Sequence, residues 1–390
     1  MSEILNIVNE HNKYRSRTLN LQASENVLSP DAREALSSDM ASRYSLLMNG
    51  EDSYGGTRFT LELVELTEKL TARVFRSKFA EVRPTGGHIA SQTVILSTMK
   101  KKENMLSIQE KFGGYTGYQK EYLPKMFGIQ NYDIPFNPST QEIILDNLEK
   151  VVKSSKPSLM ILGQSIFVRH YDLKPVREIC DRHGCVLAYD GSHVMGLIGG
   201  NAFQKDVLQY CDILFGSTHK TFFGPQGGVI LSNDEDIMER VRRNLTWRTM
   251  DNYHPSRLAA LGVAMEEMLK YGETYARSVT ENSKNLAMEL SKNGIKPEYE
   301  PWYSETHQVI ISETTMKKLG LDLVGFSKIL EKNGIIVDRE GRIGTAEISR
   351  MGYSKMDIIA ELISRAVKGE DVSREVEELT GNLKISYWGE

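Results

Sequence analysis

The chain has 390 residues and a formal net charge of −4, a length that accommodates one large domain and a smaller one. A mildly acidic balance, without a Lys- or Arg-rich block, a long apolar run or a signal-like start, argues against nucleic-acid binding and membrane insertion. Three cysteines without a C-x-x-C pair and eight histidines without metal-ligand spacing indicate neither disulfides nor a metal site, so we expect a cytoplasmic protein that binds no metal.

The first segments of the chain are predicted to be helical. Residues 1–17 are polar and amphipathic, and we expect them to form an arm that lies on a partner subunit. Ser24 and Asn26, a few residues before Pro30, suit the cap of a following helix. The apolar spacing further along predicts a core-packing helix over residues 60–76, with Leu63, Leu66, Leu70 and Val74 on its buried face.

Two glycines precede the next helical segment. Gly86, Gly87 and His88 lead into a helical stretch over residues 89–98. Glycine lets the backbone approach an anion closely, and the unpaired N–H groups and dipole at the start of a helix bind it. Because a glycine pair is also common at ordinary turns, the pattern alone indicates either a phosphate site or a turn.

From residue 157 the chain alternates between strands and helices. The predicted elements are strands over residues 159–162, 186–189 and 212–215, and a helix over residues 172–183. This alternation predicts a mostly parallel sheet covered by helices, in which ligands bind beyond the carboxyl ends of the strands. Polar side chains follow those ends, among them Ser165, Asp190 and His193. Taken alone, Asp190 is about as well explained as a turn or cap residue.

A lysine follows the third predicted strand. Lys220 lies between the apolar runs 213–215 and 229–231, with a glycine-rich segment behind it, so backbone on both sides can hold its amine in one direction. A held, poorly solvated lysine keeps a nucleophilic amine, as a Schiff base with a carbonyl substrate or with pyridoxal phosphate (PLP) requires. Taken alone, such a residue is more often a solvated loop lysine.

The run Thr218-His219-Lys220-Thr221, followed by Gly224-Pro225 and Gly227-Gly228, resembles the cofactor-lysine segment of serine hydroxymethyltransferases, which are fold-type I PLP enzymes. Segments from Leu21 to about Gly352 resemble the same family in the same order. The resemblance implies an α/β fold, with a large PLP-binding domain of the aspartate aminotransferase type, a mostly parallel sheet and a smaller α+β C-terminal domain. The implied domains are an arm over residues 1–17, the PLP-binding domain over 18–272 and the C-terminal domain over 273–390.

The resemblance also implies a set of cofactor contacts. Lys220 would form the Schiff base, Asp190 would pair with the protonated ring nitrogen, and His193 would lie near the ring hydroxyl. Tyr115 stands where the family has a histidine and would stack on the ring, although a tyrosine packed under its loop fits equally well. The remaining implied cofactor contacts are Gly86, Gly87, His88, Ser165, Ser217 and His219.

Substrate contacts follow from the same resemblance. Arg342, within Gly341-Arg342-Ile343-Gly344-Thr345, matches the family arginine that holds the substrate α-carboxylate, for which a guanidinium fork is suited. The alternative is an arginine in a surface turn. Ser24, Tyr44 and Tyr54 match further substrate contacts, and Tyr54 joins Lys220, Asp190 and His193 among the implied catalytic residues.

Three further positions depart from the family pattern. Phe167 replaces a tyrosine, and Gln226 replaces an arginine. Leu46 stands where the family has the acid that handles the substrate hydroxyl and contacts the folate, while Glu51 and Asp52 lie nearer the second tyrosine. Because leucine cannot exchange a proton, this substitution argues against folate-dependent transfer.

The C-terminal third indicates the assembly. Residues 241–257 carry four arginines with Trp247 and Tyr253, and in homologous folds this region reaches the neighbouring subunit's active site; a solvated charged face is the alternative. We therefore expect a homodimer with shared active sites. The remaining predicted elements are helices over 256–271, 275–293 and 321–333, and strands over 307–312 and 335–338.

The favoured function is that of a PLP-dependent serine hydroxymethyltransferase-like enzyme. It would cleave or form the Cα–Cβ bond of a β-hydroxy amino acid, with tetrahydrofolate or tetrahydromethanopterin as an open co-substrate. The first alternative is a folate-independent β-hydroxy amino-acid aldolase, or another PLP transferase or lyase on this fold. The second is a non-catalytic PLP-fold binding protein, against which the joint presence of Lys220, Asp190 and Arg342 speaks.

Overall fold

The computed structural model describes residues 2–48 and 50–389, and its contacts define two compact units. The terminal unit consists of the segment up to Val27 together with Tyr275–Trp388, and the central unit consists of Leu28–Thr274. Residues 18–27 thus lie with the C-terminal segment, whereas the sequence had indicated that they begin the large domain. The reason is a strand pairing that joins the two ends of the chain, in which Leu19 is opposite Ile335 in parallel register.

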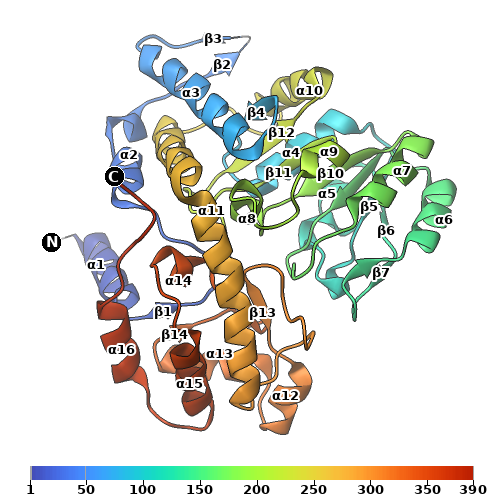
Figure 1. The fold of residues 1–390 in the computed structure, drawn as a ribbon. Coiled ribbons are helices and arrows are strands. Elements are labelled where there is room, and N and C mark those ends of the chain that lie inside the picture. Colours follow the sequence, from blue (N-terminus) through green and yellow to red (C-terminus); the bar gives the residue numbers. More distant parts are fainter. Residues whose placement is uncertain (1, 49, 390) are drawn as a thin grey trace. The chain divides into compact units, whose positions relative to one another are not determined.

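The helices and strands of the central unit are shown in Figure 1. In chain order they are α2 (Pro30–Leu36), β2 (Leu47–Met48), β3 (Glu51–Asp52), α3 (Arg58–Phe75), β4 (Phe79–Glu81), α4 (Gly87–Thr98), β5 (Asn104–Ser107), α5 (Leu123–Phe127), β6 (Gln130–Asp133), β7 (Phe136–Asn137), β8 (Glu142–Ile143), α6 (Leu145–Ser155), β9 (Leu159–Leu162), α7 (Leu173–His183), β10 (Val186–Asp190), α8 (Met195–Gly199), α9 (Val207–Tyr210), β11 (Ile213–Ser217), β12 (Gly228–Ser232) and α10 (Glu235–Leu245).

A seven-stranded sheet forms the middle of the central unit, in the order β4-β12-β11-β10-β9-β5-β6. The strands from β11 to β6 pair in parallel, and β12 runs antiparallel to both of its neighbours. Helix α4 packs against β11 and β12, and α10 packs against β4 and β12. This arrangement confirms the predicted α/β class with a mostly parallel sheet.

Helix α3 buries Leu70 and Val74 as predicted but exposes Leu66. Leu66 is 51% exposed, although the spacing of the leucines had placed it in the core. The side chains that are buried are Thr60, Val64, Thr67, Leu70, Thr71, Val74 and Phe75. Threonines tolerate this position because their hydroxyls can bond to backbone carbonyls one turn earlier, as the Thr71 hydroxyl does with the carbonyl of Thr67 at 2.7 Å.

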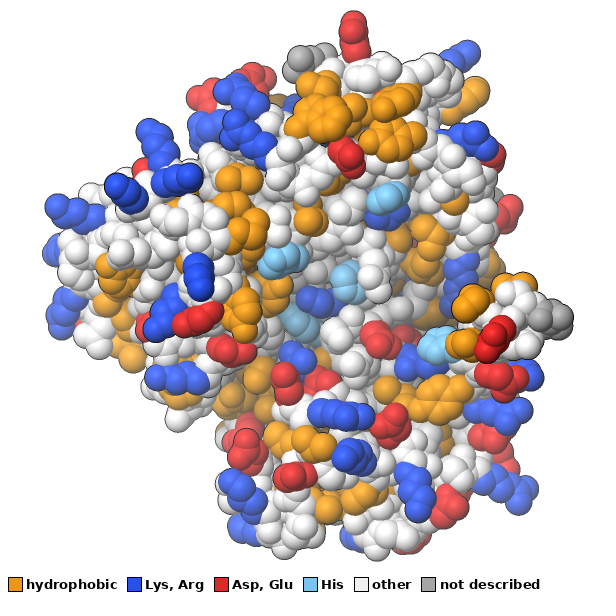
Figure 2. Space-filling view, turned by 180° about the vertical axis from the view of Figure 1, so that it is seen from behind, with side chains coloured by type: hydrophobic (Ala, Val, Ile, Leu, Met, Phe, Trp, Pro, Cys, Tyr) orange, Lys and Arg blue, Asp and Glu red, His pale blue; other side chains and the backbone are white. Residues whose placement is uncertain are grey.

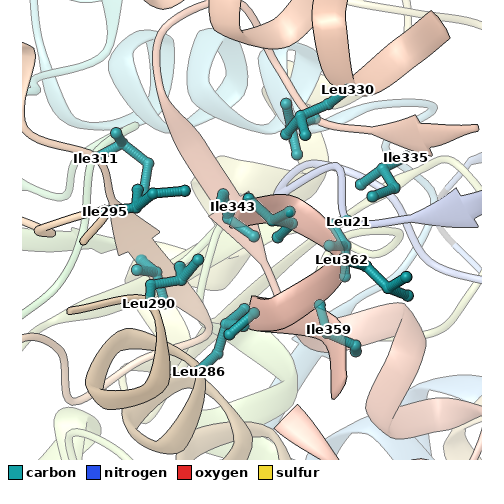
Figure 3. Packing of buried hydrophobic residues seen from close by; sticks show 14 of the residues in the cluster. Leu21, Leu286, Leu290, Ile295, Ile311, Leu330, Ile335, Ile343, Ile359 and Leu362 are labelled. Carbon is teal, nitrogen blue, oxygen red and sulfur yellow. The ribbon is translucent and has the colours of Figure 1, made fainter. Parts of the chain in front are cut away.

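The terminal unit combines short strands with helices. In chain order its elements are α1 (Glu3–Arg15), β1 (Leu19–Asn20), β13 (Gln308–Ile310), α12 (Glu313–Lys318), α13 (Leu323–Lys332), β14 (Ile335–Ile336), β15 (Arg342–Gly344), α14 (Ala346–Arg350), α15 (Met356–Val367) and α16 (Ser373–Gly381). Its apolar core gathers side chains from both ends of the chain, and in Figure 3 Leu21 lies among Ile335, Ile343 and Leu362.

Helix α11 (Pro255–Lys292) is continuous, whereas the sequence had indicated two helices separated near residue 273. Its residues up to Thr274 are counted with the central unit and the later ones with the terminal unit. Gly272 lies between the two predicted ranges, and a glycine inside a helix costs only about 1 kcal/mol relative to alanine.

Charged side chains of both signs are interspersed on the molecular face in Figure 2. Helix α1, the predicted arm, buries none of its side chains within this chain. Among the described residues, none of the helices has both the length and the apolar character that crossing a membrane requires.

Candidate active site

A pocket lies at the carboxyl edge of the central sheet, where β9, β10 and β11 end. Asp190 is the last residue of β10, Ser217 is the last residue of β11, and Lys220 follows three residues later. The residues that line the pocket are Gly87, His88, Ser91, Tyr115, Gln164, Ser165, Asp190, Ser192, His193, Ser217 and Lys220. The structure therefore brings together most of the predicted cofactor contacts, with Gly86 and His219 adjacent in sequence to lining residues.

Asp190 is held by three hydrogen-bond donors. Its Oδ1 accepts the backbone N–H of Ser192 at 3.0 Å and the Ser192 hydroxyl at 2.5 Å, and its Oδ2 accepts the Tyr118 hydroxyl at 2.6 Å. The residue is only 7% exposed. These donors hold the carboxylate in one orientation, and a carboxylate can accept a hydrogen bond from a protonated ring nitrogen.

Two glycines allow the close approach of backbone segments around the pocket. Gly163 has φ of +146°, and a Cβ there would lie 2.5 Å from the carbonyl oxygen of Asp190. Gly87 is in contact with the Ser217 hydroxyl at a point where any Cβ would overlap it. A larger residue at either position would push the carboxylate or the serine out of place.

The N-terminus of helix α4 provides an anion site in the pocket. The helix begins at Gly87, and Gly86 precedes it in extended conformation without a side-chain cap. The first N–H groups of such a helix have no partner within the helix and carry a partial positive charge. Together with the Ser217 hydroxyl beside Gly87, they form a cradle suited to a phosphate group.

The loop that carries Lys220 connects the antiparallel strands β11 and β12 and is fixed by its threonines. The Thr218 hydroxyl donates to the carbonyl of Pro225 at 2.6 Å. The Thr221 hydroxyl donates to the carbonyl of His193 at 2.8 Å and accepts the N–H of Gly196 at 3.0 Å. Lys220 is therefore anchored by the residues before and after it, as the sequence had indicated.

Neutral aromatic and imidazole groups surround the lysine. Burial, with the neighbouring charge of Lys220, lowers the pKa of His219 to about 4, so its ring is uncharged at neutral pH. Burial also lowers the pKa of His88, whose Nδ1 lies 2.9 Å from the Tyr115 hydroxyl. Gly117 gives the Tyr115 ring room, since a Cβ there would lie 2.5 Å from a ring carbon.

A buried arginine, one of the four in residues 241–257 that the sequence had placed towards the neighbouring subunit, fastens the segment before the phosphate cradle of its own chain. Arg257 donates from Nη2 to the carbonyls of Val82 at 3.1 Å and Arg83 at 3.0 Å. Burial lowers its pKa to about 10, which still leaves the guanidinium charged at neutral pH. A Cβ at Gly227 would lie 2.5 Å from its Nη1, so the arginine also lies against the end of the Lys220 loop.

The two predicted substrate tyrosines form a separate exposed group. Tyr44 and Tyr54 are 41% and 49% exposed, their rings are 4.8 Å apart, and neither lines the Lys220 pocket as described in this chain. Leu46 between them is buried, as expected for an apolar side chain. Asp52 lies beside it, and its Oδ1 accepts the N–H groups of Leu46 at 3.3 Å and Tyr54 at 2.9 Å.

Arg342 and Ser24 lie in the terminal unit, on segments that are bonded to each other. The N–H of Gly344 donates to the carbonyl of Leu21 at 2.7 Å, which places the Arg342 strand next to the Ser24 segment. The Arg342 guanidinium is already engaged, with Nε 2.5 Å from Asp338 and Nη2 3.2 Å from Glu340. Sequence reasoning did not identify this pairing, although Asp338 is only four residues away.

Comparisons with known proteins show the family to which this chain is similar. A family model described as serine hydroxymethyltransferase matches residues 1–374. The serine hydroxymethyltransferase of Methanothermobacter thermautotrophicus is 35% identical over 99% of this chain and 95% of its own length. That of Archaeoglobus fulgidus is 33% identical over 98% of this chain and 90% of its own.

One solved structure extends the comparison to three dimensions. The crystal structure of L-threonine transaldolase from Pseudomonas fluorescens, in the internal aldimine state, is similar with a TM-score of 0.87 and 25% identity, covering 99% of this chain and 92% of that one. Because a family model spans nearly the whole length and several relatives exceed 30% identity, this chain belongs to the serine hydroxymethyltransferase family.

Proposed function

We infer that the chain is a PLP-dependent enzyme that cleaves or forms the Cα–Cβ bond of a β-hydroxy amino acid, as a serine hydroxymethyltransferase does. The observation that carries this function is the shared pocket of Lys220, Asp190 and the start of helix α4. An amine, a carboxylate and a helix N-terminus are the three groups that an aldehyde, a pyridine nitrogen and a phosphate require. Family membership supports the same function.

The residues present fit PLP. We propose that Lys220 binds the aldehyde carbon, that Asp190 holds a proton on the ring nitrogen, and that the N–H groups of Gly87 and His88 with the Ser217 hydroxyl hold the phosphate. Tyr115, half-buried at the pocket wall, would cover one face of the ring. When bound, PLP supplies an electron sink for the bond that breaks at Cα.

The remaining residues would prepare this pocket for an amino acid. We propose that the rings of His88 and His193 stay close to the cofactor oxygens, and that the uncharged His219 helps to exclude water from the lysine. Arg342 would hold the substrate α-carboxylate with Ser24 nearby. Because Asp338 and Glu340 already pair with Arg342, the substrate carboxylate would have to share the guanidinium or displace one of them.

A second candidate function is favoured by one observation. The buried Leu46 stands at the position that carries an acid in the family pattern, and Asp52 beside it is bonded to backbone N–H groups. A folate-independent aldolase or transaldolase would not need that acid. The likeness to L-threonine transaldolase supports this alternative, while the curated relatives support the hydroxymethyltransferase.

We also propose a homodimer. The exposed side chains of Tyr44, Tyr54, Phe59, Leu66 and Trp247 all belong to the central unit, and Phe59 and Leu66 are spaced by seven residues on one face of α3. Apolar side chains exposed in such numbers favour a protein partner. A second copy of the chain would cover them and would bring the two tyrosines to a neighbouring site. We further propose a cytoplasmic location, which the three buried, unbridged cysteines support.

Incubation of the PLP-loaded protein with L-serine, L-threonine and L-allo-threonine tests the reaction. With tetrahydrofolate or tetrahydromethanopterin present, we expect conversion of serine to glycine, because the carrier accepts the one-carbon unit. The measurement is glycine and aldehyde release with and without each carrier. Aldehyde release from threonine without serine turnover would select the aldolase, and no absorbance change with any amino acid would leave only a binding protein.

Replacement of Lys220 by alanine tests the cofactor bond. We expect Lys220→Ala to lose the borohydride-reducible link between protein and PLP, because the alanine has no amine. Mass spectrometry of the reduced, digested protein checks this. Lys174→Ala, at an exposed position on α7, is the control and should keep the link. A link that survives in Lys220→Ala would rule out this lysine as the cofactor residue.

Replacement of Arg342 by lysine tests the carboxylate contact while keeping the charge. We expect Arg342→Lys to weaken apparent amino-acid binding about tenfold or more, since lysine cannot offer a planar two-pronged contact, and to leave PLP affinity within about twofold. Titration of the PLP-loaded protein with amino acid, followed by absorbance, measures amino-acid binding, and titration of the apo-protein with PLP measures PLP affinity. Arg339→Lys, at an exposed arginine of the same turn, is the control. Equal binding in both variants would assign Arg342 a purely structural role with Asp338.

Sedimentation tests the assembly. We expect a species of twice the 44.1 kDa chain mass, and Phe59→Asp with Leu66→Asp should shift it toward the monomer by placing charge in an apolar contact. Leu319→Asp, at an exposed leucine of the terminal unit, is the control. A dimer that persists unchanged in the double variant would show that this face of α3 is not the contact.

A further inference from the structure

Tyr118 is buried directly behind the Asp190 carboxylate and is absent from the residues that the sequence pointed to. It is 1% exposed, and its hydroxyl donates to Oδ2 of Asp190 at 2.6 Å. The Ser91 hydroxyl lies 3.1 Å from the Tyr118 hydroxyl and 3.1 Å from the carbonyl of Gly87, and its single hydrogen can serve only one of these two acceptors. These contacts place the phenol beside the first turn of helix α4.

The position of Tyr118 is fixed by its own neighbours. Its backbone N–H donates to the carbonyl of Tyr115 at 3.0 Å, and its carbonyl accepts the Asn131 side chain at 2.6 Å. Asn131 also donates to the Ser107 hydroxyl at 2.8 Å, which ties the tyrosine to strands β5 and β6. The ring of Tyr118 meets that of Tyr115 edge-on at 5.1 Å. The phenol therefore reaches Asp190 from a rigid support.

The donors around Asp190 leave one acceptor position of its carboxylate for a further donor. A carboxylate has about four acceptor positions. In the described chain, two of the donors come from Ser192 and the third is the Tyr118 hydroxyl. Burial and the adjacent Asp190 charge raise the pKa of Tyr118 well above its usual value, so the phenol keeps the proton that it donates. Because Asp190 lines the pocket, a ligand in the pocket can supply the fourth donor.

We propose that Tyr118 is the positioning residue for Asp190, fixing the carboxylate in one orientation toward the ring nitrogen of PLP. This role rests on the proposed function, because it requires a nitrogen-bearing ring in the pocket. Tyr118 does not touch the cofactor itself. It acts by holding Oδ2, so that the acceptor position that faces the pocket does not have to be reoriented when the ring binds.

The test compares two ligands in the apo-protein, PLP and its carbocyclic analogue in which a C–H replaces the ring nitrogen. Dissociation constants are measured for the wild type, Tyr118→Phe, Asp190→Asn and the double variant. The preference is the ratio of the dissociation constant of the analogue to that of PLP. We expect the wild type to prefer PLP, and this ratio to fall about tenfold in Tyr118→Phe, the effect of one hydrogen bond to a charged group. In the Asp190→Asn background, Tyr118→Phe should change the preference by less than about twofold.

A matched control separates positioning from packing. Tyr189 is also fully buried and precedes Asp190 on β10, but its hydroxyl lies near Gln204, at 3.4 Å. Tyr189→Phe should therefore keep the wild-type preference. If Tyr118→Phe weakens the binding of both ligands equally, the preference is unchanged and the tyrosine only fills space, which would overturn the proposal.

A second variant covers the case in which Tyr118→Phe does not fold, as judged by circular dichroism. Tyr118→His replaces the phenol with a ring that still offers an N–H donor, and it should retain more of the preference for PLP than Asp190→Asn does. A preference equal to that of Asp190→Asn would contradict the positioning role. If the wild type binds neither ligand, the proposed function fails. If every Tyr118 variant keeps the full wild-type preference for PLP, only the role of Tyr118 fails.

Discussion

The pocket depends on the register between β10 and β11. Asp190 is opposite Phe215 in this parallel pair, and the N–H of Gly191 donates to the carbonyl of Phe215 at 2.8 Å. A Cβ at Gly216 would lie 2.6 Å from the N–H nitrogen of Ser192, so the two strand ends are as close as backbone allows. A shift of one residue would turn Asp190 to the opposite face of the sheet and away from the lysine.

Much of the fold and of the pocket could be predicted because the relevant signals are local. The strands that end at Leu162 and Asp190 are short apolar runs followed at once by polar residues, and parallel strands bring such residues to one edge. The glycines before α4 and the loop around Lys220 are local patterns of the same kind. Their proximity in space follows from sheet topology alone.

The rest depended on contacts between distant residues, which a single sequence does not display. Tyr118 is 72 positions from Asp190, and the arginine at 257 is 174 positions from the carbonyl of Arg83 that it binds. On helix α3 the prediction failed for a different reason: the leucine spacing indicated that Leu66 is buried, whereas threonines fill part of the buried face and Leu66 is exposed. The pairing of Arg342 with Asp338 is local, but the pattern of glycines around the arginine resembled a binding loop and hid it.

The buried contact between Arg257 and Gly227 has a consequence for how this sequence can vary. Gln226 is exposed, yet both of its neighbours, Pro225 and Gly227, are buried. A side chain at position 227 would force the Arg257 guanidinium to move, and with it the contacts of that guanidinium with the carbonyls of Val82 and Arg83. The loop therefore has room for a different side chain at 226 but not at 227 unless Arg257 changes as well.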